Sequence, residues 1–299
     1  MPERISLDQA VSRALADYPR PVLTSYRLGL VVYRLVQAGE SAGQRLNVRV
    51  PNRRHYTQVL KFLKSYALIA EVPGLTRDTV FTLAGRASVS AAEIACTVDP
   101  FAYVSHLSAM EMHGLTDRVS QTLDLSSPDP KSWSRFAGEL MQRDLGEQLA
   151  EYQAARFPRL TRMRIEKLMG RPVRVTHSVH LGAFRKTPDS EVRVATIGRT
   201  FLDMLREPAL CGGIHHVLSV YREHASRNLN LIAAEVDQHG GAIDRVRAGY
   251  VLEEVCGLRH PSIENWRQSV ARGGSRKLVA ANEYAPQYSE RWALSLNAG

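Results

Sequence analysis

Hydrophobic positions recur at helical spacing in three successive segments near the start of the chain. A capping-box pattern at Ser6 opens the first segment, and Gly39 follows the second as a stop signal. Asn52 is a suitable N-cap for the third segment, which starts at Arg53. We therefore expect three helices, with a polar connector over residues 40–50 that is extended near its end.

The third helix has two distinct faces when its residues are placed at 100° steps. One side is apolar and suited to packing: Tyr56, Val59, Leu60, Leu63 and Ala67. The opposite side is basic and rich in hydrogen-bonding groups: Arg54, Thr57, Gln58, Lys61, Lys64 and Ser65. The pattern predicts a helix that packs through one face and presents the other to solvent or to a partner.

Two β-prone runs follow this helix, at residues 68–72 and 79–83. The turn-rich segment 73–78 between them contains Pro, Gly and Asp, so the runs predict a β-hairpin. Three helices followed by a hairpin is the order of a winged helix-turn-helix module, whose third helix normally enters the major groove of DNA.

The remaining chain mixes helical and strand patterns. We expect helices at about 102–113 and 132–155, strands at 121–125, 173–179 and 192–197, and mostly helix from 198 to 254. The expected fold class is α+β, with a winged helix-turn-helix DNA-binding domain at 1–96. A larger mixed α/β C-terminal domain, at 97–299, would follow it.

Composition adds a positive charge that is unevenly distributed. The 299 residues carry a net charge of +9. Residues 1–99 hold 13 Lys and Arg against 8 Asp and Glu, 100–150 hold 4 against 7, and 151–174 hold 7 against 2. Two basic blocks thus flank an acidic one, which favours a protein with a nucleic-acid face and a separate body.

The first basic block supplies the candidate DNA contacts. Arg54 and Gln58 are suited to base edges, whereas Lys61 and Lys64 are suited to phosphates. The hairpin loop could reach the minor groove or the backbone. A solvent-exposed surface helix with no partner is the alternative. The expected DNA-binding residues are Arg53, Arg54, Thr57, Gln58, Lys61, Lys64 and Arg77.

The second basic block, between residues 156 and 174, is a possible further electrostatic surface. It could guide DNA or bind an acidic partner such as a tRNA through salt-sensitive phosphate contacts. A solvated loop and helix edge is the other interpretation. The residues concerned are Arg156, Arg159, Arg162, Arg164 and Lys167.

Other chemistry has little support in the sequence. His177 and His180 would point to opposite faces of a strand, which argues against a metal site. Asp129 lies in a Pro-broken segment that a strand-to-helix turn explains better than a nuclease motif. His106 and its neighbouring serines, some of which we expect to face outward, lack the glycine-flanked elbow of a serine hydrolase. We expect Asp203 to be a structural ion-pair or capping residue.

No catalytic residue, metal or cofactor is therefore expected. The three cysteines are widely spaced and form no CxxC pair, as in a reduced cytoplasmic protein. The N-terminus lacks the apolar run of a signal peptide, and the longest apolar stretch, 28–36, is interrupted by Arg34. We expect a soluble cytoplasmic protein with no membrane partner.

Four stretches carry a resemblance to the AbiEi family of antitoxins: residues 58–74, 100–117, 194–213 and 291–297. The resemblance implies an antitoxin of a type IV, abortive-infection toxin–antitoxin system that takes part in phage defence. It implies repression of the protein's own operon through inverted-repeat operator DNA, with two copies on the DNA. It further implies opposition to a cognate nucleotidyltransferase toxin without a stable complex.

Two alternatives from other classes stay open. One is a nuclease or nucleic-acid-modifying enzyme that carries a winged-helix head. The other is an effector-sensing transcription regulator whose C-terminal body binds a small molecule.

Overall fold

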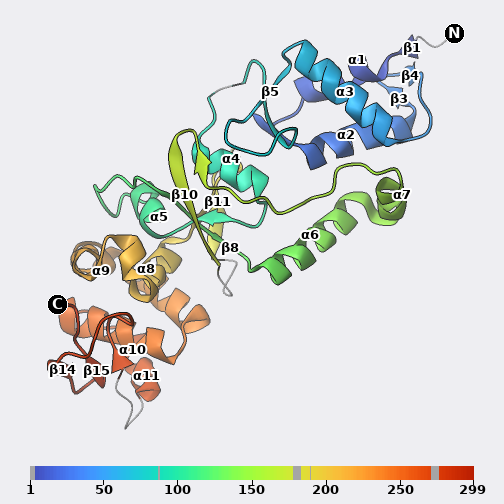
Figure 1. Ribbon diagram of the computed structural model, residues 1–299. Helices are drawn as coiled ribbons and strands as arrows, with labels where there is room; N and C mark the ends of the chain where they lie inside the picture. The colour runs from blue at the N-terminus through green and yellow to red at the C-terminus, as the bar shows by residue number, and fades with distance from the viewer. Residues whose placement is uncertain (1–3, 87, 178–182, 189, 271–275) are drawn as a thin grey trace. The chain divides into compact units, whose positions relative to one another are not determined.

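The computed structural model describes residues 4–86, 88–177, 183–188, 190–270 and 276–299 (Figure 1). Helices and several separate sheets make the fold α+β, as expected. The chain forms two compact units that interleave along the sequence. Unit 1 comprises Met1–Ala102, Ser127–Val173 and Pro188–Val192, and unit 2 comprises Tyr103–Ser126, Arg174–Thr187 and Arg193–Gly299. The domain boundary at 96/97 remains a prediction.

Unit 1 opens with the three expected helices, α1 (Leu7–Ala16), α2 (Ser25–Ala38) and α3 (Arg53–Ser65). Ser6 forms the capping box with Gln9, which satisfies orphan amides at the start of α1. Gly39 adopts the left-handed conformation (φ 68°) that ends α2. The local signals for these helices are confirmed.

A three-stranded sheet accompanies these helices. Its strands are β2 (Val22–Thr24), β5 (Ile69–Glu71) and β6 (Val80–Leu83). β6 lies in the middle and pairs antiparallel with both β5 and β2. The hairpin expected after the third helix is thereby confirmed, and β2, which directly precedes α2, is the third strand of the sheet.

The connector between α2 and α3 differs from the expectation. It forms a small hairpin of β3 (Glu40–Ser41) and β4 (Gln44–Leu46), rather than an extended end after residue 46. Ala42 and Gly43 both adopt positive φ and make the tight turn. β1 (Arg4–Ile5) then pairs parallel with β4, so the hairpin closes against the start of the chain.

The later segments of unit 1 are α4 (Ala91–Val98), α6 (Pro130–Leu145), α7 (Leu149–Ala154) and β9 (Lys167–Leu168). The single helix expected over 132–155 is divided by a 3₁₀ turn at Gly146–Gln148, because Gly146 has a positive φ of 56°. β9 pairs antiparallel with the first residues of β10 (Arg171–His177).

Segments far apart in the sequence share the core of unit 1. Tyr152 packs edge-on against Tyr33 at 5.2 Å between ring centroids, and Phe157 packs against Tyr33 at 5.6 Å and Tyr56 at 6.4 Å. All four rings are buried. The core of α1–α3 is therefore completed by residues about 100 positions later in the chain.

Two acidic side chains of the later helices bind α2. Asp144 accepts hydrogen bonds from the Tyr26 hydroxyl at 2.9 Å and from Arg27 at 3.0 Å. Glu151 accepts from the Tyr33 hydroxyl at 3.1 Å and from Gln37 at 2.7 Å. Asp144, from the acidic block seen in the sequence, thus neutralises Arg27, and Glu151 adds hydrogen bonds to the same helix.

Unit 2 contains a mixed sheet with the strand order β11-β12-β7-β8-β10. Its other strands are β7 (Tyr103–Val104), β8 (Leu123–Ser127), β11 (Phe184–Lys186) and β12 (Arg193–Ala195). The helix expected from residue 102 begins later, as α5 (His106–Met112), because Tyr103 and Val104 pair with strands on both sides.

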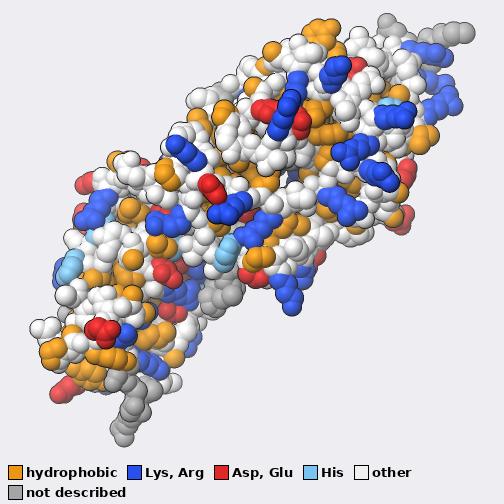
Figure 2. All heavy atoms as spheres, in the orientation of Figure 1, with side chains coloured by type: hydrophobic (Ala, Val, Ile, Leu, Met, Phe, Trp, Pro, Cys, Tyr) orange, Lys and Arg blue, Asp and Glu red, His pale blue; other side chains and the backbone are white. Residues whose placement is uncertain are grey.

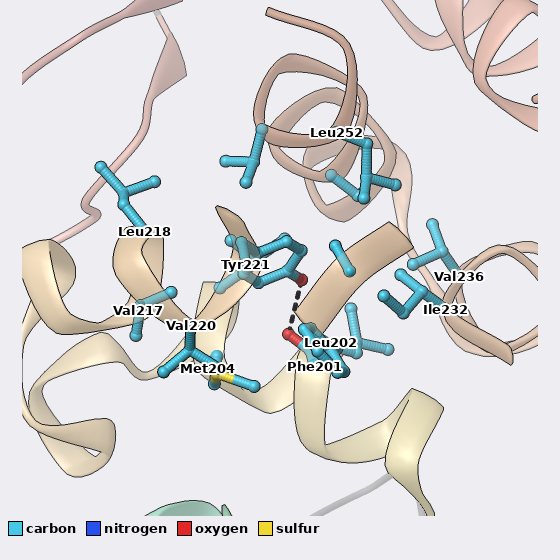
Figure 3. Packing of buried hydrophobic residues seen from close by; sticks show 14 of the residues in the cluster. Phe201, Leu202, Met204, Val217, Leu218, Val220, Tyr221, Ile232, Val236 and Leu252 are labelled. Atoms are coloured by element: carbon cyan, nitrogen blue, oxygen red, sulfur yellow. Dashed lines mark hydrogen bonds between the residues drawn. The ribbon is translucent and has the colours of Figure 1, made fainter. Parts of the chain in front are cut away.

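Helices complete unit 2: α8 (Ile197–Arg206), α9 (Ile214–His239), α10 (Ala242–Tyr250) and α11 (Pro261–Trp266). A small C-terminal sheet of β13 (Arg276–Lys277), β14 (Tyr288–Ser289) and β15 (Leu294–Ser295) follows. Phe201 and Tyr221 are central to the core, where the Tyr221 hydroxyl donates to the Phe201 carbonyl at 2.8 Å (Figure 3).

Candidate nucleic-acid interface

Helix α3 is built as its sequence pattern predicts. The Asn52 side chain accepts hydrogen bonds from the backbone amides of Arg54 and His55 at 2.9 and 3.3 Å, which fixes the start of the helix. Four apolar side chains of the back face are buried: Tyr56, Val59, Leu60 and Leu63. Ala67 lies beyond the helix and is exposed. The outward face carries exposed side chains at Arg53, Arg54, Thr57, Gln58 and Lys61.

Two of these exposed residues make hydrogen bonds within the protein. Gln58 donates to the Asp8 carboxylate of α1 at 3.2 Å. The Thr57 hydroxyl donates to the carbonyl of Arg53 at 3.1 Å. Arg54 and Lys61 extend from the same face, so they are the side chains best placed to meet a partner first.

Lys64 has a different environment from Lys61. Its ammonium group makes ion pairs with Glu71 of β5 and Asp78 of the hairpin loop, and lies 5.8 Å from the centre of the Phe81 ring. Burial disfavours the charged form, but hydrogen bonds and charges from the two carboxylates outweigh this effect and raise the pKa of Lys64. Lys64 therefore joins α3 to the hairpin rather than extending toward solvent.

Arg77 lies in the loop between β5 and β6. Its side chain is 85% exposed and only 4.0 Å from a carboxylate oxygen of Asp78, which Lys64 already binds. Asp78 itself adopts a positive φ of 61°, one of the few non-glycine residues to do so. The loop thus presents one long cationic side chain to solvent.

The second basic stretch divides into two parts. Arg156 and Arg159 line an open cavity of about 570 Å³ together with Arg53 and Thr57 of α3. Arg162, Arg164 and Lys167 follow in the loop and strand beyond the cavity. Arg164 contacts Glu166 at 3.0 Å, with both side chains largely exposed.

The stretch also reaches the hairpin loop. The carbonyl oxygen of Lys167 lies so close to Gly74 that a Cβ there would stand 3.3 Å from it. Residues 156–167 therefore extend from the start of α3 to the hairpin, and the two basic blocks belong to one surface of unit 1. Figure 2 shows Lys and Arg side chains gathering on the face that carries α3 and α7. No periodicity or spacing in the sequence indicates this association.

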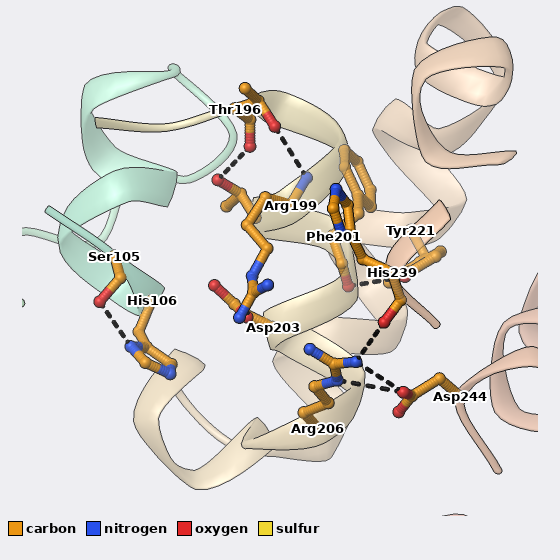
Figure 4. A network of polar contacts seen from close by, with 11 residues as sticks. Ser105, His106, Thr196, Arg199, Phe201, Asp203, Arg206, Tyr221, His239 and Asp244 are labelled. Atoms are coloured by element: carbon orange, nitrogen blue, oxygen red, sulfur yellow. Dashed lines mark hydrogen bonds and ion pairs between the residues drawn. The ribbon is translucent and has the colours of Figure 1, made fainter. Parts of the chain in front are cut away.

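The residues considered for other chemistry have structural partners. Asp129 caps α6 by accepting from the amides of Lys131 and Ser132 at 2.9 and 3.2 Å. Hydrogen bonds from the Ser132 side chain and then from the Ser132 amide lower the pKa of Asp129. Asp203 forms a buried ion pair with Arg199 at 2.7 Å (Figure 4). Both agree with the structural roles expected for them.

Ser105 and His106 are buried, contrary to the expectation that some of these side chains face outward. The Ser105 hydroxyl lies 2.8 Å from Nδ1 of His106, and burial lowers the pKa of the imidazole (Figure 4). They face inward because β7 ends directly before them and α5 packs against α8.

His177 ends β10, whereas His180 lies outside the described residues. In the described part of the chain, no group of His, Cys, Asp or Glu is arranged to hold a metal ion. Across the same residues, no helix has the length and apolar character needed to span a membrane. Cys96, Cys211 and Cys256 form no disulfide among the described residues, and the first two are buried.

Comparison with known proteins gives a likeness of fold. No family model matches the chain, and no curated protein is significantly similar to it. The crystal structure of RV2827C protein from Mycobacterium tuberculosis is similar, with a TM-score of 0.51 and 13% sequence identity over 96% of this chain and 90% of that one. At this identity the likeness concerns the fold alone.

Proposed function

We propose that this protein binds operator DNA through a winged helix-turn-helix module, with α3 as the reading helix and the β5–β6 hairpin as the wing. The observation that carries the proposal is the arrangement of the helices α1, α2 and α3 with the sheet β2-β6-β5, in which the β5–β6 hairpin directly follows α3, together with an exposed basic face on α3. An α-helix fits the major groove, where Arg can donate two hydrogen bonds to guanine.

The exposure and the hydrogen bonds of the expected DNA-binding side chains refine the role that we propose for each of them. Arg54 and Lys61 are the primary DNA contacts on the front of α3, and Arg77 is the wing contact. Gln58 reads a base only if it exchanges its hydrogen bond with Asp8 for one with DNA. Lys64 holds the wing against α3 through its two carboxylate partners.

The physiological role that we propose is that of an AbiEi-type antitoxin. The protein would repress its own operon by binding inverted repeats as two copies, and would oppose a nucleotidyltransferase toxin without forming a stable complex with it. The support for this role is the sequence resemblance over four stretches of the chain. We expect no catalysis by this chain, since Asp129 and Asp203 have structural partners.

Binding to the DNA upstream of the protein's own gene tests the first part. Fluorescence anisotropy would compare the wild type with Arg54→Ala, which should weaken specific binding by about 1–3 kcal/mol. Arg143→Ala, on the exposed side of α6, removes the same charge and should leave specificity unchanged. Equal affinity for that DNA and for unrelated duplexes in the wild type would contradict operator recognition.

Co-expression tests the second part. If the gene beside this one encodes a nucleotidyltransferase-like toxin, the full-length protein should rescue cells from the growth arrest that it causes. Arrest that persists despite soluble expression of the protein would exclude an antitoxin role. Nucleic-acid cleavage or modification that is lost on changing Asp129 or Asp203 would instead favour an enzyme.

A further inference from the structure

The cavity beside α3 is lined by parts of unit 1 that are distant in the sequence. Arg53, Tyr56, Thr57 and Leu60 come from α3, and Gln153 comes from α7. Ser25 at the start of α2, Asp78 of the hairpin and the segment Arg156–Arg159 complete the lining. Its volume of about 570 Å³ is within the range of small-molecule sites.

Three guanidinium groups line this cavity without a carboxylate to bind them. Arg53, Arg156 and Arg159 have no side-chain partner among the described residues. By contrast, Arg27 pairs with Asp144 and Arg206 with Asp244 in the same chain. Three like charges at one cavity repel one another, so the arrangement favours an anionic ligand.

The acidic residue of the lining does not neutralise the three arginines. Asp78 is the carboxylate among the lining residues, and its oxygens already contact Lys64 and, at 4.0 Å, Arg77. The net charge of the lining therefore remains positive.

Tyr56 supplies an independent indication that this cavity binds a ligand. Its side chain is 7% exposed, and its hydroxyl has no hydrogen-bond partner among the described residues. Burial first, and then the charge of Asp78, raise the pKa of Tyr56, so the hydroxyl stays protonated and able to donate. Buried hydroxyl groups in proteins are normally hydrogen-bonded, which makes this one a donor available to a bound anion.

The donor set fits phosphate better than a carboxylate. Arginine forks match the oxygens of phosphate, and phosphate can accept further hydrogen bonds from hydroxyl groups. Ser25 adds a second such hydroxyl group to that of Tyr56, whereas the Thr57 hydroxyl already donates to the Arg53 carbonyl. The cavity also exceeds a single phosphate in size, and its apolar side chains, Leu60, Phe157 and Pro158, suit the remainder of a larger phosphorylated molecule.

We infer that this cavity is a phosphate-binding site in which Arg53, Arg156 and Arg159 hold the anion and Tyr56 donates a hydrogen bond to it. The phosphate group belongs either to the backbone of bound DNA or to a free phosphorylated compound. The first source rests on the proposed DNA-binding function, whereas the site itself does not.

Titration calorimetry of the full-length protein with inorganic pyrophosphate tests the site. The variants are the double change Arg156→Ala/Arg159→Ala, the single change Tyr56→Phe, and the control Arg45→Ala/Arg143→Ala. The control removes the same number of charges from exposed positions outside the cavity lining. Thermal unfolding of each variant verifies that unit 1 remains folded.

The Arg156→Ala/Arg159→Ala variant should bind pyrophosphate about tenfold or more weakly than the wild type, since hydrogen bonds between charged groups are stronger than those between neutral groups. Tyr56→Phe removes one oxygen and should reduce affinity by a smaller factor, with an unchanged unfolding temperature. The control should bind like the wild type. Equal pyrophosphate affinity of the Arg156→Ala/Arg159→Ala variant and the control variant would overturn the inference. So would a wild type that binds no pyrophosphate.

A second arm distinguishes the two sources of phosphate. If the phosphate belongs to DNA, pyrophosphate should compete with duplex DNA. The Arg156→Ala/Arg159→Ala variant should then have a slope of log DNA affinity against log salt concentration that is smaller by about two. If it belongs to a free compound, pyrophosphate should bind without displacing DNA. A protein that binds pyrophosphate in this cavity but binds no DNA would refute the proposed function alone.

Discussion

Lys61 and Lys64 lie three residues apart on α3 and have opposite surroundings. Lys61 is exposed on the front of the helix, whereas Lys64 is shared between the carboxylates of Glu71 and Asp78. From sequence alone both are equally good phosphate contacts. The difference arises because α3 packs beside the hairpin, and only one of the two positions faces it.

This contrast predicts separable effects of two alanine changes. Lys61→Ala should lower the slope of log affinity for DNA against log salt by about one, because one phosphate contact is lost. Lys64→Ala should leave that slope nearly unchanged and destabilise the fold by roughly 0.2–1 kcal/mol, the range for partly exposed ion pairs. Anisotropy at several salt concentrations and urea unfolding measure the two quantities. Equal slopes for both variants would contradict the assignment.

His106 gives unit 2 a predictable response to acid. Burial lowers the pKa of the imidazole below its ordinary value of 6.5, against the opposing charges of Asp203, Asp124 and Glu207 and with a smaller contribution from Arg174. The unfolded chain therefore binds the proton at higher pH than the folded one. The contribution of His106 to the free energy of unfolding is fully present above pH 6.5. It is lost as the pH falls below this value, through the lower pKa of the folded protein.

His106→Gln should make the unfolding temperature less sensitive to pH between about 7.5 and about 5. The wild type should lose more stability over this window than the variant. His55 and His216 also have lowered pKa values because of burial, so some pH dependence should persist. Parallel pH profiles for the wild type and the variant would show that His106 is not responsible.

At the scale of elements, α2 meets the segment after α7 through a glycine. A Cβ at Gly29 would lie 2.6 Å from the Tyr152 hydroxyl and 3.1 Å from Cδ of Pro158. The Tyr152 hydroxyl is itself held by donating to the carbonyl of Pro158 at 2.6 Å. Glycine permits this approach because it lacks the atom that would collide.

Gly29→Ala should therefore destabilise the protein by about 1–3 kcal/mol, as in other overpacked sites. Gly138→Ala is a matched control in α6, where a Cβ meets nothing within 4 Å and φ is not positive. The control should be neutral or stabilising by about 0.5–1 kcal/mol because alanine favours helix. Urea unfolding gives both values, and an unaffected Gly29→Ala variant would refute the packing argument.

Local signals account for the elements that could be predicted from sequence. The caps at Ser6 and Asn52 and the turn after β5 each depend on a few neighbouring residues, so their pattern is visible in one segment. The division of α6 from α7 was missed because Gly146 lies in an otherwise helical pattern. The strand β7 was missed because Tyr103 and Val104 pair with strands far along the chain.

Only part of the candidate site could be predicted, because local sequence signals do not reveal contacts between distant segments. The face of α3 follows from helical periodicity, but the approach of Arg156 and Arg159 to Arg53 does not. It depends on Tyr152 and Phe157 packing into the helical core, and a buried aromatic pair in one segment carries no information about its partner segment.

At the scale of the whole molecule, the chain enters and leaves unit 1 more than once. Tyr103 pairs with Ser126 across β7 and β8, so the points where the chain leaves unit 1 and returns to it are neighbours in space. Residues 127–173 then supply Met141, Leu145, Tyr152 and Phe157 to its core. The expected DNA-binding domain, 1–96, lacks all four of these core residues.

A fragment of residues 1–96 should therefore unfold without a cooperative transition and bind a hydrophobic dye. A fragment that joins 1–102 to 127–173 through a short flexible linker should recover cooperative unfolding, because Ala102 and Ser127 adjoin the paired residues. Circular dichroism during thermal unfolding measures both. A stable, cooperative 1–96 fragment would support an independent N-terminal domain instead.

The late arrival of Tyr152 and Phe157 also has a consequence for protein synthesis. About 90 residues separate the end of α3 from Phe157, which the ribosome adds in about 5–20 seconds. During that interval the aromatic side chains of α2 and α3 lack their partners, so chaperones have a hydrophobic surface to bind. We expect slower translation over this stretch to lengthen the exposure and to lower the yield of folded protein.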